Sequence, residues 1–417
     1  MYVLGERIRT LRKKNKMTLE ELAGDQLTKG MLSQIENNKA KPSMESLEYI
    51  AKRLGVAITE LLEMVSSEEL RKVLDEVERN YEESFINYMD NDHTIQTCTN
   101  IIELVEPYLS NLTDSYQSAR LFEIYSYCLF CLKKEDWLLY WNKAALIYDS
   151  LNLTANRAQM GHFKCMTYFI TRRFQETLQC FLEEKNHLNT VHIKIDPMTQ
   201  VSLDYHEAAI YSALGNTKAT SEAMQRALTF SRKEKIYYKT DKIYQLAAIE
   251  ALLGKESDRF NYYLKKLKQY GEFMEDELFI ELCDVLYVEY LLHIEGNIQE
   301  AMIIIDRYCL PVPGIPEKIA GDNWNMLQKG KALFYGRKYE QALDILQTIF
   351  IPAYMNHPVD LAIYYLKDTF LALCHKECGN REKALTYAKM AYDHFSLLPP
   401  SIFKKLTVDT YVSLLAD

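Results

Sequence analysis

The sequence TLEELAGDQLTKGMLSQIENNKAKPS, residues 18–43, decides how the N-terminal part of this chain folds. Thr18 precedes a short segment whose leucines and alanine share one face, so its hydroxyl is expected to cap an amphipathic helix. A break of four residues follows and begins with Gly24, the residue type that a tight turn between two helices often needs. Thr28 is then expected to cap a second helix, Lys29–Glu36. The pattern predicts a helix-turn-helix.

The second of these helices has the residue types of a recognition helix. Leu32 and Ile35 are expected to face inward, which leaves polar side chains outside, where they can reach base edges in a major groove. The capped N-terminus of the helix is expected to be free for a phosphate. The predicted DNA-binding residues are Lys29, Gly30, Ser33 and Gln34 on the helix, Asn37, Asn38 and Lys39 after it, and Thr18 and Arg12 before it.

A basic segment lies directly before the motif. Residues 7–16 hold six cations and no acid: Arg7, Arg9, Arg12, Lys13, Lys14 and Lys16. A run of charge is usually only a solvated face, but beside a reading helix it lies where phosphates would be. The alternative is a small helical bundle with no ligand. The agreement of the whole stretch with the motif, rather than of one or two positions, favours DNA binding.

Length and charge indicate a division of roles along the chain. At 417 residues it is too long for one helix-turn-helix domain, so two or more units are expected. Residues 1–65 carry a net charge of +2 and the remainder −11, so we expect DNA contact only in the N-terminal unit. The nine cysteines are scattered, and the chain has neither a signal peptide nor an apolar run of about 20 residues. These features predict reduced thiols in a cytoplasmic protein without a membrane segment.

Two more short helices are expected to complete an N-terminal domain of five helices over residues 1–65. Met44–Leu54 has an apolar stripe and ends at a glycine, and Thr59 precedes a helical segment over 60–65. The sequence Ser-Ser-Glu-Glu then starts a connecting helix over 66–90. A helical connection would couple the two units mechanically better than a glycine linker.

The remainder of the chain, 91–417, is predicted to consist of repeated helical hairpins. Turn signals recur with spacings of 39, 42, 39, 42, 40 and 43 residues, at Lys134, Arg173, Gly215, Gly254, Gly296, Gly336 and Gly379. The helix after the turn carries an alanine small enough to lie against its partner, at Ala223, Ala301, Ala342 and Ala384. This pattern resembles the tetratricopeptide repeat, although its period is about 40 rather than the usual ~34 residues. The predicted fold is therefore all-α, with about seven hairpins and flanking helices in a right-handed superhelix.

The first helices of the hairpins would line a concave groove suited to an extended peptide. Tyrosines, amides and cations suit such a ligand, whose backbone needs donors and acceptors and whose ends carry charge. For any single position, an ordinary packing or solvated role is the alternative. Counting back from each turn by three and four residues predicts peptide contacts at Tyr125, Lys164, Tyr205, His206, Tyr244, Gln245, Tyr290, Asn323, Met326 and Lys367, with Thr369 in the same register.

Two pairs of cysteines are spaced like metal or redox sites. Cys128 and Cys131, and likewise Cys374 and Cys378, nevertheless lie in apolar helices without a nearby pair of histidines. The sequence also has no His-Glu-x-x-His, no phosphate-cradling glycine loop and no nucleophile elbow. We therefore expect no metal, no cofactor and no enzymatic activity.

The helix-turn-helix with LSQIENNKAKPS, residues 32–43, joined to repeats of this length, resembles the Rap/Rgg/NprR/PlcR/PrgX group of quorum-sensing regulators, and in layout its NprR-like members. The resemblance is specific over the first 65 residues and generic in the repeats. It implies a homodimeric cytoplasmic transcription factor whose repeat groove binds a short secreted and re-imported oligopeptide. The peptide would change the spacing of the two DNA-binding units. Inner-face amides would hold the peptide backbone, which makes Asn323 and Gln245 the foremost candidates.

A two-fold dimer would require a near-palindromic operator. Two other functions stay open. The repeats could serve as a protein-interaction scaffold that docks a response regulator, as relatives without a DNA-binding unit do. The chain could also be a phage or plasmid repressor that binds no peptide.

Overall fold

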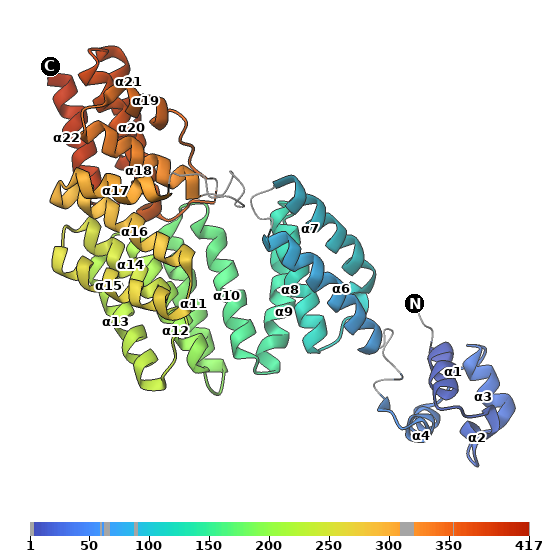
Figure 1. Ribbon diagram of the computed structural model, residues 1–417. Coiled ribbons are helices and arrows are strands. Elements are labelled where there is room, and N and C mark those ends of the chain that lie inside the picture. Colours follow the sequence, from blue (N-terminus) through green and yellow to red (C-terminus); the bar gives the residue numbers. More distant parts are fainter. Residues whose placement is uncertain are drawn as a thin grey trace. The chain divides into compact units, whose positions relative to one another are not determined.

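The structure is a computed structural model that describes residues 4–58, 61, 67–86, 91–308, 321–352 and 354–416. Over these residues the chain is all-α, with helices and no strand, as the sequence predicts (Figure 1). It divides into two compact units, Met1–Met160 and Gly161–Asp417.

Short helices around one apolar core form the N-terminal part of the first unit. They are α1 (Leu4–Lys14), α2 (Leu19–Ala23), α3 (Lys29–Glu36) and α4 (Met44–Leu54). The predicted bounds of the last three helices are confirmed. Each is preceded by an N-cap residue, Thr18, Thr28 or Ser43, whose hydroxyl accepts a hydrogen bond from a backbone N–H of the first turn. The predicted fifth helix over 60–65 lies outside the described residues except for Leu61, which is buried.

The first unit continues as a stack of longer helices. These are α6 (Ser67–Ile86), α7 (Asn91–Val105), the 3₁₀ helix η1 (Glu106–Asn111), α8 (Tyr116–Cys131) and α9 (Trp137–Ser150). The helix predicted over 66–90 is present as α6, and it packs against both α7 and α8. Apolar side chains that include Leu74, Val77, Ile101 and Ile124 form the core between these helices.

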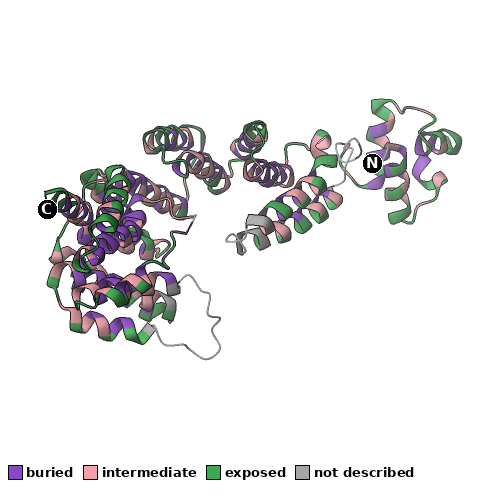
Figure 2. Cartoon of the chain, turned by 90° about the horizontal axis from the view of Figure 1, so that it is seen from above, coloured by how far each residue is buried: buried purple, intermediate pink, exposed green. Residues whose placement is uncertain are grey.

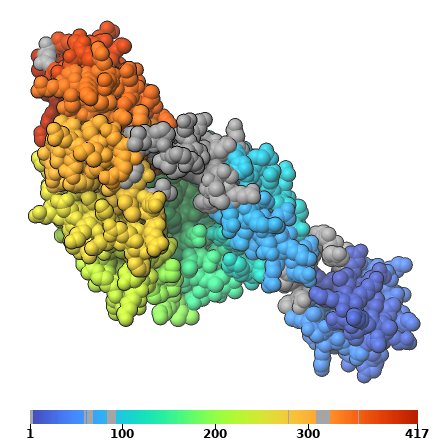
Figure 3. Space-filling model, in the orientation of Figure 1, coloured from blue at the N-terminus to red at the C-terminus, as the bar shows by residue number. Residues whose placement is uncertain are grey.

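The second unit repeats one hairpin several times, after α10 (Thr154–Phe169), which crosses the boundary between the units. Figure 3 shows successive hairpins next to one another on the surface, from green to red. The remaining helices are α11 (Phe174–Val191), α12 (Pro197–Ala213), α13 (Thr217–Glu234), α14 (Thr240–Leu253), α15 (Ser257–Met274), α16 (Glu277–Tyr290) with the π-helix η2 (Leu291–Glu295), α17 (Ile298–Tyr308), α18 (Gly321–Tyr335), α19 (Tyr339–Leu346), α20 (Pro358–Glu377), α21 (Arg381–Ser396) and α22 (Ile402–Ala416).

The turns inside the hairpins confirm the predicted period. A residue with positive φ occurs about every 40 residues, at Lys133, Arg172, Gly215, Lys255, Gly296, Arg337 and Gly379. Gly254 and Gly336 lie in turns as predicted, although in each the left-handed conformation is taken by the next residue. At Lys134 and Arg173 it is taken by the preceding residue.

The small residues of the second helices lie where two helices meet. Ala223, Ala301, Ala342 and Ala384 are all fully buried, as the sequence predicts. Buried residues, shown in purple in Figure 2, follow the helix faces that meet inside and between hairpins. Each hairpin therefore depends on its neighbours to cover its apolar faces.

Within the second unit, residues far apart in the sequence also meet. Nε2 of His357, the residue before α20, lies 3.0 Å from the carbonyl oxygen of Ala209 in α12. A Cβ at Gly215 would lie 2.8 Å from the Cβ of Pro399, in the segment between α21 and α22. The later hairpins thus pack against the earlier ones in addition to following them in the stack.

Candidate functional site

The outward face of α3 is polar and accessible. Lys29, Gly30 and Gln34 are exposed and Ser33 is half-buried, whereas Leu32 and Ile35 are buried as predicted. The Nζ atom of Lys29 lies 3.7 Å from a carboxylate oxygen of Glu20. Met31, which the sequence argument passed over, is 50% exposed on the same helix. An exposed apolar side chain there can contact the methyl group of a thymine.

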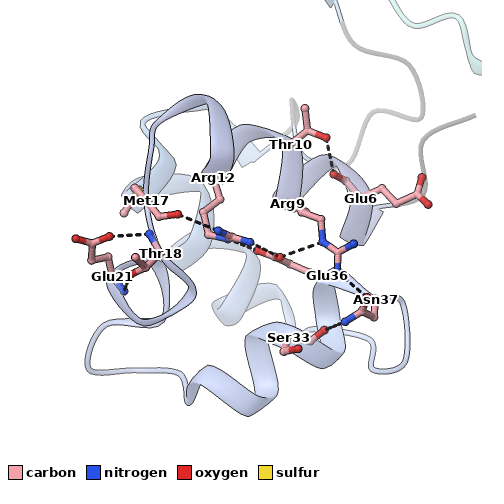
Figure 4. Close-up of polar contacts among 10 residues, drawn as sticks. All are labelled: Glu6, Arg9, Thr10, Arg12, Met17, Thr18, Glu21, Ser33, Glu36 and Asn37. Atoms are coloured by element: carbon pink, nitrogen blue, oxygen red, sulfur yellow. Dashed lines mark hydrogen bonds and ion pairs between the residues drawn. The ribbon is translucent and has the colours of Figure 1, made fainter.

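A buried charge network holds α3 against α1 (Figure 4). Glu36, at the end of α3, is buried, and Arg12 binds it through two hydrogen bonds, Nε–Oε1 at 2.6 Å and Nη2–Oε2 at 2.9 Å. Arg12 also donates to the carbonyl oxygen of Met17 at 2.9 Å. The hydrogen bond to Glu36 raises the pKa of Arg12 despite its partial burial. This guanidinium is therefore directed into the domain.

The basic segment thus separates into two kinds of residue. Arg7 is buried, and Arg9 binds Glu36 and the side-chain oxygen of Asn37, the latter at 2.6 Å. The lysines at positions 13, 14 and 16 are exposed. These exposed lysines are the cations of the segment best placed for a phosphate contact, and among them Lys14 also lies 3.3 Å from a carboxylate oxygen of Glu68.

The residues after α3 close the helix. Asn37 donates from Nδ2 to the carbonyl oxygen of Ser33 at 2.7 Å while its Oδ1 accepts from Arg9, so both ends of its amide are engaged. Asn38 has φ 57°, and its Oδ1 accepts from the backbone N–H of Gly5 at 2.9 Å. The backbone N–H of Lys39 donates to the carbonyl oxygen of Gln34, which completes a left-handed helix stop. The side chain of Lys39 is exposed.

Thr18 and the turn after α2 fix the orientation of the motif. The Thr18 hydroxyl accepts from the backbone N–H of Glu21, and the Glu21 carboxylate accepts from the backbone N–H of Thr18, a reciprocal capping box that lowers the pKa of Glu21. Gly24 has φ 56°, and a Cβ there would overlap the hydroxyl of Tyr49. Tyr49 in turn donates to the carboxylate of Asp25 at 2.8 Å, which ties the turn to α4.

In the helical repeats, several residues that were predicted to contact a peptide are buried and contact other parts of the chain instead. Tyr125 and Tyr290 are buried, and Tyr290 stacks on Phe260 with ring centroids 4.6 Å apart. The side-chain amide of Asn323 is buried and binds the backbone of Phe350 twice, from Nδ2 to the carbonyl oxygen at 2.7 Å and from the N–H to Oδ1 at 3.3 Å. Asn323 therefore holds the segment after α19. The buried hydroxyl of Thr369 bonds that of Thr407 in α22.

Other predicted contacts are half-buried. Lys164 forms an ion pair with Glu184 at 2.8 Å, and Lys367 forms one with Asp368 at 3.0 Å. Tyr244, Gln245 and Met326 are also half-buried, and Tyr244 and Met326 pack against the apolar core.

The remaining two predicted residues lie together in one cluster. The ring of His206 in α12 stacks on that of His162 in α10, with centroids 3.7 Å apart and an angle of 8° between the planes. Nε2 of His206 lies 3.1 Å from Nζ of Lys239, and this Nζ lies 5.0 Å from the ring centre of Tyr205. The cluster thus joins the first helices of consecutive hairpins. Lys239 precedes the third of these helices, α14. It was not predicted, because counting back from the turns selects only residues within the first helices.

A hollow of about 1070 Å³ lies elsewhere in the second unit, between α13 and the segment that leads into α12. None of the predicted peptide residues lines it. Asp204 at its edge binds Lys185 at 3.1 Å, and Arg226 binds Glu207 at 3.0 Å, so both of these charges are already paired.

The two members of each cysteine pair differ in exposure. Cys128 and Cys374 are buried, whereas Cys131 is half-buried and Cys378 is exposed. Within the described residues, no group of three or more His, Cys, Asp or Glu side chains is placed to hold a metal ion. No helix in that part of the chain is long and apolar enough to cross a membrane.

Comparison with protein families gives a match for the N-terminal part, to a model described as "Helix-turn-helix domain", over residues 5–67. Residues 5–67 are a helix-turn-helix domain. In this domain α2 and α3 are the two helices of the motif, and α3 is the helix in the recognition position. A comparison with curated proteins found no match.

Solved structures similar to this chain include members of the group that the sequence resembles. PlcR from Bacillus thuringiensis, in complex with the peptide PapR7 and DNA, is 18% identical, with 67% of this chain and 98% of that chain covered and a TM-score of 0.34. The competence regulator ComR from Streptococcus vestibularis, in its apo form, is 19% identical, with 67% and 95% covered and a TM-score of 0.33. PrgX, in complex with iCF10, is 14% identical, with 100% and 96% covered and a TM-score of 0.19.

Proposed function

We propose that this chain is a cytoplasmic DNA-binding transcriptional regulator whose helical body binds a short signalling oligopeptide. The single observation that carries the DNA-binding half is the face of α3 in a helix-turn-helix domain. It is polar and accessible, while a buried arginine–glutamate pair fixes the helix from behind. A recognition helix needs both properties, because base readout depends on side chains held within hydrogen-bonding distance of base edges.

The exposure and contacts of the predicted DNA-binding residues support a separate role for each group of them. We assign base reading to Ser33 and Gln34, with Met31 as an apolar contact, and backbone contact to Lys39 and the exposed lysines before the motif. Arg12 has its guanidinium in the domain interior, so we assign it a structural role. A homodimer would place two α3 helices on a near-palindromic operator.

For the helical body, the support is the half-buried cluster of Tyr205, His206 and Lys239 on consecutive first helices. Its aromatic, imidazole and ammonium groups can contact a peptide backbone or terminus. The half-buried amide of Gln245 in α14 is a further candidate. A peptide would regulate DNA binding only if it bound one arrangement of the dimer better than another.

The DNA half is tested by selecting duplexes from a random pool with the full chain and then titrating the selected sequence. Replacing Gln34 with Ala should reduce the preference at one base position by about 1–3 kcal/mol and leave binding to random DNA unchanged. Replacing Lys39 with Gln should weaken binding to all sequences and reduce the salt slope by about 0.9. The exposed Lys242 of the body, replaced with Gln, is the matched control and should have no effect. Equal behaviour of the Gln34 and Lys39 variants would contradict these roles.

The peptide half is tested by thermal shift of the full chain with synthetic penta- to decapeptides, together with mass spectrometry of any peptide that co-purifies. A saturable rise in unfolding temperature with one sequence, and a change in operator affinity at the same concentration, is the expected result. Selective DNA binding without any stabilising peptide would instead indicate a repressor that binds no peptide. Capture of a response regulator by the body would indicate the scaffold function.

A further inference from the structure

Lys239 is a half-buried cation at the start of α14, next to the first helix of the preceding hairpin. It has φ 55° and lies directly before α14, so its side chain is fixed at the point where this helix begins. Besides its contact with His206, its Nζ lies 5.0 Å from the ring centre of Tyr205 and 5.6 Å from that of Tyr238. The ammonium group is therefore bordered by two aromatic rings and an imidazole.

The partners of this ammonium differ from those of three other half-buried lysines in the unit. Lys164, Lys185 and Lys367 each have a carboxylate oxygen within about 3 Å. Among the residues that the structure describes, Lys239 has no carboxylate within the 4.0 Å of an ion pair. The neighbouring Asp241 instead pairs with Lys242 at 3.7 Å.

Burial lowers the pKa of Lys239, and the charge of the nearby Asp241 only partly offsets this effect. Burial, together with the charge of Lys239, lowers the pKa of His162 to about 4, and burial and the two neighbouring groups lower the pKa of His206 well below its usual value. Both stacked imidazoles are therefore neutral near pH 7, and in the tautomer that leaves Nε2 unprotonated His206 accepts a hydrogen bond from the ammonium. Burial raises the pKa of Tyr205, with smaller contributions from the charges of Asp360 and Asp241, and burial likewise raises the pKa of Asp360.

An ammonium with three donors and one imidazole acceptor retains room for an anion. Partial burial has removed part of its hydration, and a carboxylate can replace that hydration with a charge-assisted hydrogen bond. Tyr238, which is 41% exposed, borders the site and offers apolar surface to the residue that carries the carboxylate. We propose that Lys239 and His206, with Tyr205 and Tyr238 as walls, bind a carboxylate of the peptide ligand. This inference rests on the proposed function and adds to it the chemical group that the body recognises.

The test uses small molecules that carry a carboxylate and little else of a peptide. N-acetylglycine presents the carboxylate of a peptide C-terminus, and N-acetylglycinamide is its neutral counterpart. Each is titrated into the full chain labelled with ¹³C at the histidine Cε1 positions, with the resonances assigned by replacing His162 and His206 with Phe. N-acetylglycine should shift both resonances in a saturable manner, and N-acetylglycinamide should not. Equal shifts from the neutral probe would overturn the proposal.

Matched variants separate a specific site from general attraction to positive charge. Replacing Lys239 with Gln should weaken binding of N-acetylglycine at least tenfold, and replacing the exposed neighbour Lys242 with Gln should leave it unchanged. Replacing Lys239 with Arg should retain binding, which excludes loss of fold as the cause. Undiminished binding by the Lys239→Gln protein would refute the assignment.

A further probe distinguishes the two sources of a peptide carboxylate. The α-amide of N-acetylaspartic acid carries only a side-chain carboxylate. Tighter binding of N-acetylglycine would assign the site to a C-terminus, and tighter binding of the aspartate derivative would assign it to an acidic side chain. If no probe binds but an oligopeptide still stabilises the chain, the proposed carboxylate site is contradicted and the proposed function stands. If the probes bind but no oligopeptide does, the anion site exists and the proposal of a peptide ligand is contradicted.

Discussion

Replacing Arg12 with Met should destabilise the helix-turn-helix domain without removing a DNA contact. The side chain of Arg12 is 11% exposed and that of Glu36 is 1% exposed, so solvent screens their interaction little. Breaking a buried pair by removing one partner costs about 3–5 kcal/mol, because the other charge stays buried. Arg9 also reaches Glu36, at 3.4 Å, and can replace part of the lost interaction. We therefore expect the lower end of that range, about 3 kcal/mol.

Hydrogen exchange measured by mass spectrometry on the full chain reports this loss locally. A loss of about 3 kcal/mol corresponds to exchange that is on the order of a hundredfold faster in peptides from α1 and α3. Replacing the exposed Lys13 with Met is the matched control and should leave exchange unchanged. The double variant with Met at both Arg12 and Glu36 should recover much of the stability, because no unpaired charge remains buried.

DNA titration distinguishes this interpretation from a phosphate contact. With random-sequence DNA, the Lys13 variant should show a salt slope that is smaller by about 0.9, whereas the folded fraction of the Arg12 variant should keep the original slope. Unchanged exchange in the Arg12→Met protein, together with a smaller salt slope, would refute the structural role.

Further predictions concern the helical body, each with the full chain. Gly215→Ala should cost more stability than Gly296→Ala, about 2 against about 1 kcal/mol in thermal unfolding; both have φ 72°, but only the first Cβ meets another residue. Asn323→Ala should cost about 2 kcal/mol and speed exchange at the amide of Phe350, because buried backbone groups lose their partner. His162 has a pKa of about 4 against its ordinary 6.5, so the folded state loses stability as the pH falls from 6.5 to 4. His162→Phe should make the unfolding temperature less dependent on pH in that range, and an unchanged dependence would contradict this.

The helices of the motif could be predicted from the sequence because their signals are local. Thr18 and Thr28 cap α2 and α3 as expected, and Leu32 and Ile35 face the core. What the sequence could not show is that Glu36 draws Arg12 inward, because this pairing joins residues from two helices. A cation in a basic segment has the same sequence signature whether it faces phosphate or a buried acid.

The hairpin period could also be predicted, but not which residues line the body. Gly254 and Gly336 mark the turns, but the sequence does not show that Lys255 and Arg337 take the left-handed conformation there. Counting back from a turn gives the position of a residue along the axis of the first helix, but not the direction in which its side chain points. Asn323 and Tyr290 therefore turned out to be internal, while Lys239, in a connection between hairpins, had no place in that count.

The pairing at Glu36 has a consequence for how such a domain could be reprogrammed. The groups that anchor α3, namely Glu36 and the leucine and isoleucine beneath it, occupy a different side of the helix from Ser33 and Gln34. Altering the latter two would exchange the preferred operator while the scaffold kept its shape. New operator specificities could then be selected from a library randomised only at codons 33 and 34. Every member of the library would retain the hydrogen bonds between Glu36 and Arg12.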